Sequence, residues 1–280
     1  MRRNSRMIFL KWLLATATLG LSIVNPAIAQ SYPSKPIKII VPYPPGNASD
    51  TMSRIIGDQL AKRLGQPIVV ENRPGATGGI GAQAVARSAP DGHTLLMTST
   101  SFTINTALTK NLMYDVEKDF DPVAMVSTGG GLVLLVPSDS PVNTVGQLVE
   151  LLKKSPGTLN YAHVGRGTIQ HLTMESFLSA TATKATEVPY KGSVQGLTDL
   201  ASGQVQMMFD GQGSSLPFVQ AGKLKPIAIS SDERARTYPN VPTASESGIP
   251  GLKNWRVSGW VALLAPAKTR VAILNRLNQE

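Results

Sequence analysis

The chain has 280 residues, of which 42% are hydrophobic and 16% charged, with a formal net charge of +9, no cysteine and three histidines. At roughly 150 residues per domain the length predicts two domains, and the high apolar content excludes a disordered chain. The absence of cysteine excludes a disulfide scaffold, a thiolate metal site and a cysteine nucleophile. Three scattered histidines are too few for a histidine-rich metal centre, so we expect neither a metal nor a cofactor.

Residues 1–29 are predicted to be an export signal. Four basic residues within the first eleven positions precede an apolar segment at 12–24, which is shorter than the roughly 20 residues needed to span a bilayer. The small residues of 27–29 predict cleavage after Ala29. Met7 stands where a twin-arginine signal needs a second arginine, so the pattern favours ordinary secretion. The alternative is an uncleaved anchor helix.

The charge that remains after cleavage is modest. Removing 1–29 takes four of the 27 basic residues and none of the 18 acidic ones, which leaves 23 against 18 and a formal charge of +5. The basic residues are scattered and aromatic residues are few, so nucleic-acid binding is not expected. A mild positive field suits anionic solutes or a membrane partner, and a cysteine-free exported chain fits the bacterial periplasm.

The first part of the exported chain alternates strands, small-residue turns and helices. A β-branched strand at 37–41 leads through a proline-rich turn to a helix, for which Ser49 or Asp50 is the expected N-cap and Gly65 the stop. Further strands and helices are predicted at 67–70 (strand), 82–88 (helix), 93–97 (strand) and after 101 (helix).

A second α/β unit follows, and the chain then returns to the first. Strands are predicted at 132–136, 159–163, 186–189, 205–209 and 224–230, with helices at 144–153, 168–179 and 194–202. The apolar strand 257–264 is a candidate return crossing. Alternation of strands and helices predicts parallel sheets covered on both faces. An amphipathic helix begins at 269 and reaches Glu280 without a C-cap, so we expect that the chain is cut short there.

Five turns join a strand end to a helix start, at 44–50, 75–81, 98–101, 164–168 and 190–193. Such a turn presents free backbone N–H groups and the positive end of a helix dipole, which together bind anions. In open α/β sheets, ligands bind outside the carboxyl ends of the strands. Several of these turns facing one cleft would therefore form an anion site.

Catalytic motifs are weak. The segments 79–84 and 165–170 imitate a dinucleotide fingerprint, but the first lies too far from its strand and the second lacks the third glycine. The sequence contains neither a phosphate-binding P-loop nor a G-x-S-x-G nucleophile elbow. His163 and His171 do not have metal-ligand spacing, and we interpret them as structural or surface residues, with a cleft donor role for His171 as the alternative.

Other polar residues near these turns leave two interpretations open. Arg166 either pairs with a ligand carboxylate or is solvated. Asp210 ends an apolar strand and either fixes an amine or hydroxyl of the ligand or caps the next loop. Tyr190 offers an aromatic wall, and Lys191 either a cation or a solvated side chain.

Eight segments in order resemble the Bug-type periplasmic solute-binding receptors of tripartite tricarboxylate transporters. These segments are 36–46 followed by Asp50, 64–76, 89–96, 159–162, 188–192, 208–210, 239–243 and 259–266. The resemblance implies an α/β, two-domain type II periplasmic binding-protein fold (Venus flytrap) with a cleft between its lobes. It implies a first domain of 30–130 and 256–280, a second of 131–255, and crossings near 128–131 and 255–259. We expect a monomer.

The resemblance also implies that backbone groups and ordered water hold a ligand carboxylate between the loops 43–51 and 164–168. With the cleft residues considered above, the predicted ligand-binding residues are Tyr43, Pro45, Gly46, Asn47, Ala48, Ser49, Asp50, Ser99, Thr100, Gly165, Arg166, Gly167, Thr168, His171, Tyr190, Lys191, Gly192 and Asp210. The sequence departs from the family at Asn47 and Ala48, where further glycine is usual, although asparagine tolerates left-handed geometry. It also departs at Arg166, where a small polar residue is usual. We hypothesise that Arg166 favours ligands with a second anionic group. Family members also run on by a few tens of residues.

The leading prediction is a non-catalytic receptor that captures a small organic acid and docks on the large and small membrane subunits of a transporter. A dicarboxylate, a tricarboxylate, an acidic amino acid and an aromatic acid all fit one carboxylate clamp, and whether a cognate transporter exists stays open. The alternative is an exported α/β hydrolase-like enzyme that uses His171 with a nearby serine or Asp210.

Overall fold

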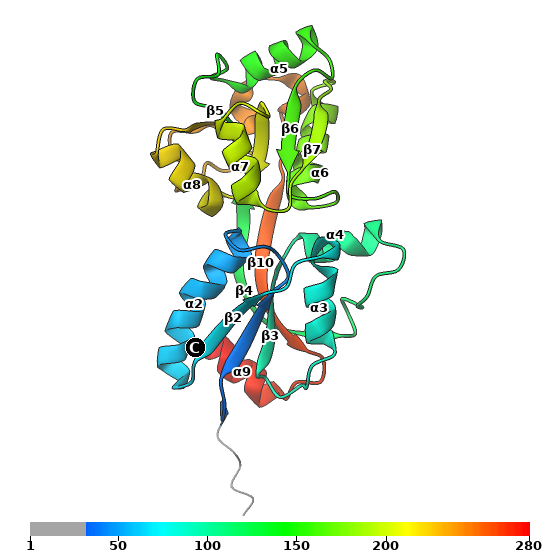
Figure 1. Cartoon of the computed structure of the whole chain (residues 1–280), viewed down its shortest axis with the longest axis vertical. Helices are drawn as coiled ribbons and strands as arrows, with labels where there is room; N and C mark the ends of the chain where they lie inside the picture. The colour runs from blue at the N-terminus through cyan, green and yellow to red at the C-terminus, as the bar shows by residue number, and fades with distance from the viewer. Residues whose placement is uncertain (1–31) are drawn as a thin grey trace, which may run out of the picture. The chain divides into compact units, whose positions relative to one another are not determined.

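A computed structural model describes residues 32–280, so the predicted export signal and its cleavage after Ala29 lie outside the described residues. Residues 35–280 form one compact unit. Its strands divide between two five-stranded sheets, each accompanied by helices (Figure 1). Within residues 32–280, no helix has the length and apolar character needed to cross a membrane.

The first sheet has the strand order β2-β1-β3-β10-β4. Its strands are β1 (Ile37–Val41), β2 (Ile68–Asn72), β3 (Thr94–Ser99), β4 (Phe120–Gly131) and β10 (Ser258–Pro266). Its helices are α2 (Ala48–Leu64), α3 (Gly79–Ala86), α4 (Ser101–Leu108) and α9 (Val271–Gln279), with the short 3₁₀ helix η1 (Ala76–Gly78) before α3.

The second sheet has the order β7-β6-β8-β5-β9. Its strands are β5 (Val133–Pro137), β6 (Asn160–His163), β7 (Thr186–Pro189), β8 (Met207–Asp210) and β9 (Leu224–Ile229). Its helices are α5 (Val145–Lys154), α6 (Ile169–Ala180), α7 (Ser193–Ala201) and α8 (Gln212–Gln220), followed by the 3₁₀ helices η2 (Ala244–Ser247) and η3 (Pro250–Leu252). The predicted two α/β lobes are confirmed.

Both sheets are mixed, which corrects the prediction of parallel sheets. In the first sheet β10 is antiparallel to β3 and β4, and in the second β5 is antiparallel to β8 and β9. The reason is that β5 and β10 enter their sheets directly from the other sheet. The parallel strands run toward the connection between the sheets, so a strand that enters from that connection runs the opposite way.

Ser230 joins the two segments that connect the sheets. The Ser230 hydroxyl accepts from the Leu132 amide at 2.8 Å and donates to the Val257 carbonyl at 2.6 Å. The Ser230 amide donates to the Leu132 carbonyl, and the Val257 amide donates to the Ser230 carbonyl. The residues just after β4 and just before β10 are therefore hydrogen-bonded to the same buried serine.

The second sheet is buried on both faces because successive side chains of a strand point to opposite sides. Along β5, Leu134 and Val136 pack into one apolar cluster with Phe177 of α6. Val133 and Leu135 pack into the other with Leu197 of α7. In the first sheet, a cluster of Phe102, Tyr114 and Phe120 stacks beside buried Ile40 and Leu96.

Two elements were not predicted. Strand β4 contains Pro122 and ends in three glycines, so it lacks the alternation of apolar and polar residues that indicates a strand. Helix α8 contains Pro217 and many small polar residues, so no apolar face recurs at helical spacing. Most other bounds agree with prediction to within a few residues.

Candidate functional site

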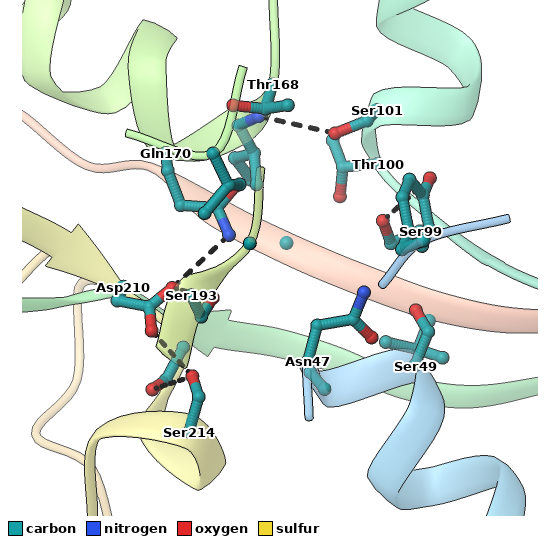
Figure 2. A pocket seen from close by; sticks show the side chains of 18 of the residues that line it. Asn47, Ser49, Ser99, Thr100, Ser101, Thr168, Gln170, Ser193, Asp210 and Ser214 are labelled. Carbon is teal, nitrogen blue, oxygen red and sulfur yellow. Dashed lines mark hydrogen bonds between the residues drawn. The ribbon is translucent and has the colours of Figure 1, made fainter. Parts of the chain in front are cut away.

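A cavity of about 720 Å³ opens where the two sheets meet. It is lined from the first sheet by the segments after β1 and β3, from the second by the segments after β6, β7 and β8, and by the crossing strands β4 and β10. Figure 2 shows Asn47 and Ser49 across the cavity from Asp210, Ser193 and Ser214. The predicted turns therefore do share one cavity.

Six helices within residues 32–280 begin at this cavity. The first residue or the N-cap of each lines it, namely Ala48 of α2, Gly78 of α3, Ser101 of α4, Ile169 of α6, Ser193 of α7 and Gln212 of α8. The first N–H groups of a helix have no intrahelical partner, and the helix dipole is positive at this end. Of the lining residues, Lys191 and Asp210 carry the charged side chains. The groups that this lining offers to an anion are therefore mainly backbone amides and hydroxyls.

The loop before α2 is fixed by its own helix. Asn47 is the N-cap, with its Oδ1 accepting from the Asp50 amide at 2.9 Å, which corrects the expected N-cap of Ser49 or Asp50. Asp50 instead reaches back to accept the Gly46 amide, in the manner of a capping box. The left-handed residue is Gly46, at φ +87°, whereas Asn47 is extended, so the loop does not draw on the tolerance of asparagine for left-handed geometry.

Asp50 is almost fully buried and ionised. Burial opposes its charge, but hydrogen bonds from the Arg54 guanidinium, the Gly46 amide and the Asn72 side chain outweigh burial and lower the pKa of Asp50 below its ordinary 3.8. The Asp50 carboxylate is therefore occupied by hydrogen bonds within the loop and its surroundings. Ala48 and Ser49, the first residues of α2, line the cavity.

A network of hydrogen-bonded hydroxyl groups lies beside this loop. Ser99 Oγ donates to the Tyr43 hydroxyl at 3.1 Å, and the Tyr43 and Thr98 hydroxyls share a hydrogen bond of 3.2 Å. Burial raises the pKa of Tyr43, so its phenol stays neutral. Thr100 Oγ1 accepts from the Trp260 amide at 2.9 Å and so ties the start of α4 to β10.

The second loop, 164–168, meets the first sheet through Ser101. Ser101 Oγ accepts from the Ile169 amide at 3.3 Å, and Thr168 is the N-cap of α6 (Figure 2). Gly165 and Gly167 have φ of +126° and +80°, which L side chains rarely adopt. Their amides donate to Nδ1 of His163 at 3.1 Å and of His171 at 3.3 Å.

His163, His171 and Glu187 are the described residues whose types and spacing could hold a metal. Both Nε2 atoms lie near Glu187 Oε2, at 3.2 and 3.4 Å. Because both Nδ1 atoms accept backbone N–H groups, each neutral ring carries its proton on Nε2 and donates it to Glu187. A metal at Nε2 would need the opposite tautomer. The arrangement therefore fits a hydrogen-bonded triad that anchors the loop and does not fit a metal centre.

Asp210 lies at the end of β8 and is fully buried. Ser193 Oγ donates to its Oδ1 at 2.8 Å, Ser214 Oγ to its Oδ2 at 2.7 Å, and Gln170 Nε2 to its Oδ1 at 3.4 Å. Burial raises the pKa of Asp210, and the hydrogen bonds from Ser214, Ser193 and Gln170 oppose that rise.

The structure places most of the predicted site residues at the cavity. Those that line it are Tyr43, Asn47, Ala48, Ser49, Ser99, Thr100, Gly165, Thr168, Tyr190, Lys191, Gly192 and Asp210. Those that do not are Pro45, Gly46, Asp50, Arg166, Gly167 and His171. Two pairs among the latter are hydrogen-bonded to each other outside the cavity lining. The Gly46 amide donates to Asp50, and the Gly167 amide donates to His171.

Arg166 differs most from its predicted role. Its side chain is 78% exposed and pairs with Glu187, so it points away from the expected ligand carboxylate. Sequence reasoning could not foresee this pair, because it depends on β6 and β7 being neighbours in the sheet. It also missed Gln170, Ser214 and Trp260, which line the cavity, and it placed Ser193 in a candidate turn without naming it as a ligand-binding residue. Ser193 and Ser214 each follow a strand end by a few residues, and that position was the available signal.

Sequence comparison assigns the chain to a family of receptors. The family model for TctC, the tripartite tricarboxylate transporter family receptor, matches residues 52–280. The chain belongs to this receptor family. Protein BugT of Bordetella pertussis is 37% identical over 265 residues, which cover 94% of this chain and 79% of BugT.

Solved structures of similar proteins share the fold of this TctC-family receptor. The structure of a periplasmic transporter is 39% identical, with a TM-score of 0.82 over 88% of this chain and 82% of that one. MatC from Rhodopseudomonas palustris, solved with bound malate, is 34% identical, with a TM-score of 0.80 over 89% and 83% of the two chains. The predicted family and the two-lobed periplasmic binding-protein fold are confirmed, and the protein is a solute-binding receptor.

Proposed function

We propose that this receptor captures a small organic acid in the periplasm, leaves it chemically unchanged, and delivers it to the large and small membrane subunits of a tripartite tricarboxylate-type transporter. The observation that carries the proposal is the convergence of six helix N-termini on one cavity whose lining contains a single cationic side chain, Lys191. Free backbone amides at helix N-termini bind carboxylates without a paired side-chain charge. Malate bound to the related MatC supports a carboxylate ligand.

The predicted ligand-binding residues that line the cavity form the proposed binding site. A carboxylate between the start of α2 and the loop 164–168 would receive donors from both sheets. Such a ligand binds the closed arrangement better than an open one and so favours closure. We place the lobe boundaries at 130/131 and 255/256, next to the Ser230 junction, and the cleavage site after Ala29.

The alternative, a hydrolase that pairs His171 with a serine or Asp210, has less support. The two ring nitrogens of His171 lie within hydrogen-bonding reach of Gly167 and Glu187, outside the cavity lining. Ser193 and Ser214 donate their protons to Asp210. A serine nucleophile needs a base that accepts its proton beside the substrate, and these contacts favour binding over nucleophilic catalysis.

The proposal is tested by calorimetry and thermal melting of the exported protein with dicarboxylates, tricarboxylates, acidic amino acids and aromatic acids. A matched diamide of each dicarboxylate is the control, since it keeps the shape and loses the charge. We expect one ligand per chain, a raised melting temperature for a bound acid by mass action, and no effect of its diamide. Mass spectrometry of the recovered ligand should show it unchanged. Failure of every carboxylate to bind, or release of an altered product, would reject the receptor proposal.

A further inference from the structure

The side of the cavity formed by α7, α8 and β8 has a different hydrogen-bonding character from the side formed by α2. It is built around Asp210, a fully buried carboxyl that nevertheless lines the cavity. Its hydrogen-bond partners among the described residues are neutral: the Ser193 and Ser214 hydroxyls, the Gln170 amide and the Gly211 backbone.

These contacts fix the direction of the hydrogen bonds. A serine hydroxyl has one proton and two lone pairs. Ser193 directs that proton at Asp210, at 2.8 Å, and the proton of Ser214 faces Asp210 at 2.7 Å and the Gly211 carbonyl at 3.0 Å. Both protons are thus used within the protein, and the two oxygens retain only lone pairs for a ligand. Asp210 itself is fully buried and already receives its donors, so it acts through the two serines. The outward lone pairs of Ser193 and Ser214 form a wall that accepts hydrogen bonds, and we name the serines and the carboxylate that orients them the acceptor wall (Asp210, Ser193 and Ser214).

The opposite side of the cavity donates hydrogen bonds. Ala48 and Ser49 begin α2 and have no intrahelical acceptor for their N–H groups. Figure 2 shows this helix start facing the acceptor wall across the cavity. The two sides are close, because a Cβ placed on Gly211 would lie 4.0 Å from Ala48 Cβ. A carboxylate bound at α2 therefore has its neighbouring atoms within reach of the acceptor wall.

We propose that Asp210 makes this wall a subsite for a hydrogen-bond donor on the ligand, so that the receptor selects carboxylates bearing a hydroxyl or ammonium group next to the carboxylate, that is, 2-hydroxy or 2-amino acids. The inference rests on the proposed function and deepens it. A ligand without such a donor leaves the lone pairs of Ser193 and Ser214 unpaired, and a second carboxylate there brings further lone pairs and no proton.

The experiment compares three acids of one chain length: succinate, which lacks the donor, malate, which has a hydroxyl, and aspartate, which has an ammonium group. Affinities are measured by calorimetry for the wild type, for Asp210→Asn, and for Asp58→Asn, an exposed carboxylate of α2 that matches the change in charge and size. We expect malate, aspartate or both to bind the wild type at least about tenfold more tightly than succinate. In Asp210→Asn that ratio should fall to near one, with succinate affinity changed by less than about threefold, and Asp58→Asn should keep the wild-type ratio.

The larger affinity gain over succinate, for malate or for aspartate, identifies whether the subsite prefers a hydroxyl or an ammonium group. If Asp210→Asn does not fold, Ser193→Ala decides, since it removes one acceptor oxygen and keeps the carboxylate; we expect it to lower the ratio about threefold. Equal affinity for the three acids in the wild type, or an unchanged ratio in Asp210→Asn and Ser193→Ala, overturns the inference and leaves the receptor proposal intact. Binding of none of the three also overturns it, whereas the receptor proposal fails only if the wider acid panel is negative too.

Discussion

The Asp50 carboxylate accepts the backbone amide of Gly46 at 2.9 Å, four residues before it, and so fixes the loop that presents the start of α2 to the cavity. The same carboxylate receives Arg54 and Asn72 from outside the cavity. The residue that shapes this part of the site therefore does not itself line it.

Replacing Asp50 with asparagine should weaken both the fold and the site. The variant keeps one acceptor oxygen but loses the charge, so the bonds from Arg54 and Gly46 fall from the roughly 1.5–3 kcal/mol of charge-assisted hydrogen bonds toward the roughly 0.5–1.5 kcal/mol of neutral ones. We expect a loss of about 2–3 kcal/mol in the free energy of urea unfolding and a weaker carboxylate affinity. The lowered pKa of Asp50 means that its contribution is present above its unfolded pKa and is lost as pH falls below 3.8. Unchanged stability at pH 7 would contradict this role.

Ala48→Pro tests the backbone donors of α2 directly. Proline fits the first helical position, Asn47 before it is already extended, and the substitution removes one N–H from the cavity. We expect roughly ten- to a hundredfold weaker ligand binding with nearly unchanged stability. Val271→Pro is the matched control, because Val271 is the exposed first residue of α9 and follows an extended Arg270. Equal effects of the two prolines on affinity would count against a carboxylate at α2.

Ser230→Ala should loosen the connection between the two sheets. The substitution leaves the Leu132 amide and the Val257 carbonyl without their shared hydroxyl in a buried position. We expect a stability loss of about 1–3 kcal/mol and faster hydrogen exchange of the Leu132 amide than of amides within β5. Exchange that rises equally everywhere would indicate global destabilisation only.

Arg166→Ala should leave ligand affinity within about twofold and the urea midpoint of unfolding nearly unchanged. The guanidinium is exposed and pairs with Glu187, and exposed ion pairs contribute little. Titration of the variant with a dicarboxylate and a monocarboxylate checks this. A selective loss of dicarboxylate binding would support the hypothesis drawn from the sequence, that Arg166 favours a second anionic group.

Acid should destabilise the loop 164–168 through His163. Burial, with the nearby His171, lowers the pKa of His163, although the Gly165 amide and Glu187 act against that shift. The unfolded chain then binds more protons than the folded one, so this contribution to stability is complete above pH 6.5 and declines as pH falls below it. In His163→Asn, whose Oδ1 can still accept the Gly165 amide, urea unfolding between pH 7.5 and 5 should depend less on pH. An identical pH slope would exclude His163 as the cause.

Much of the fold followed from local pattern. The β-branched run at Ile37–Val41 and the strand Thr186–Pro189 have the predicted bounds, and Gly65 ends α2 in the left-handed conformation that favours glycine. Strand β4 escaped prediction, because its proline and glycines hide a pairing that β10 supplies from more than a hundred residues away. Pairing of that kind has no local signature.

The sequence by itself determined the family, the two α/β lobes and the small-residue turns where helices begin, because these depend on residue type, spacing and periodicity. Only the tertiary structure decided which turn residues line the cavity and which stabilise the turns without lining it. Arg166 meets Glu187, and Ser193 meets Asp210, through the order β7-β6-β8 of the second sheet. Strand order joins residues that are distant in the chain, and the buried partner that each polar group finds there sets its charge and the direction of its hydrogen bonds.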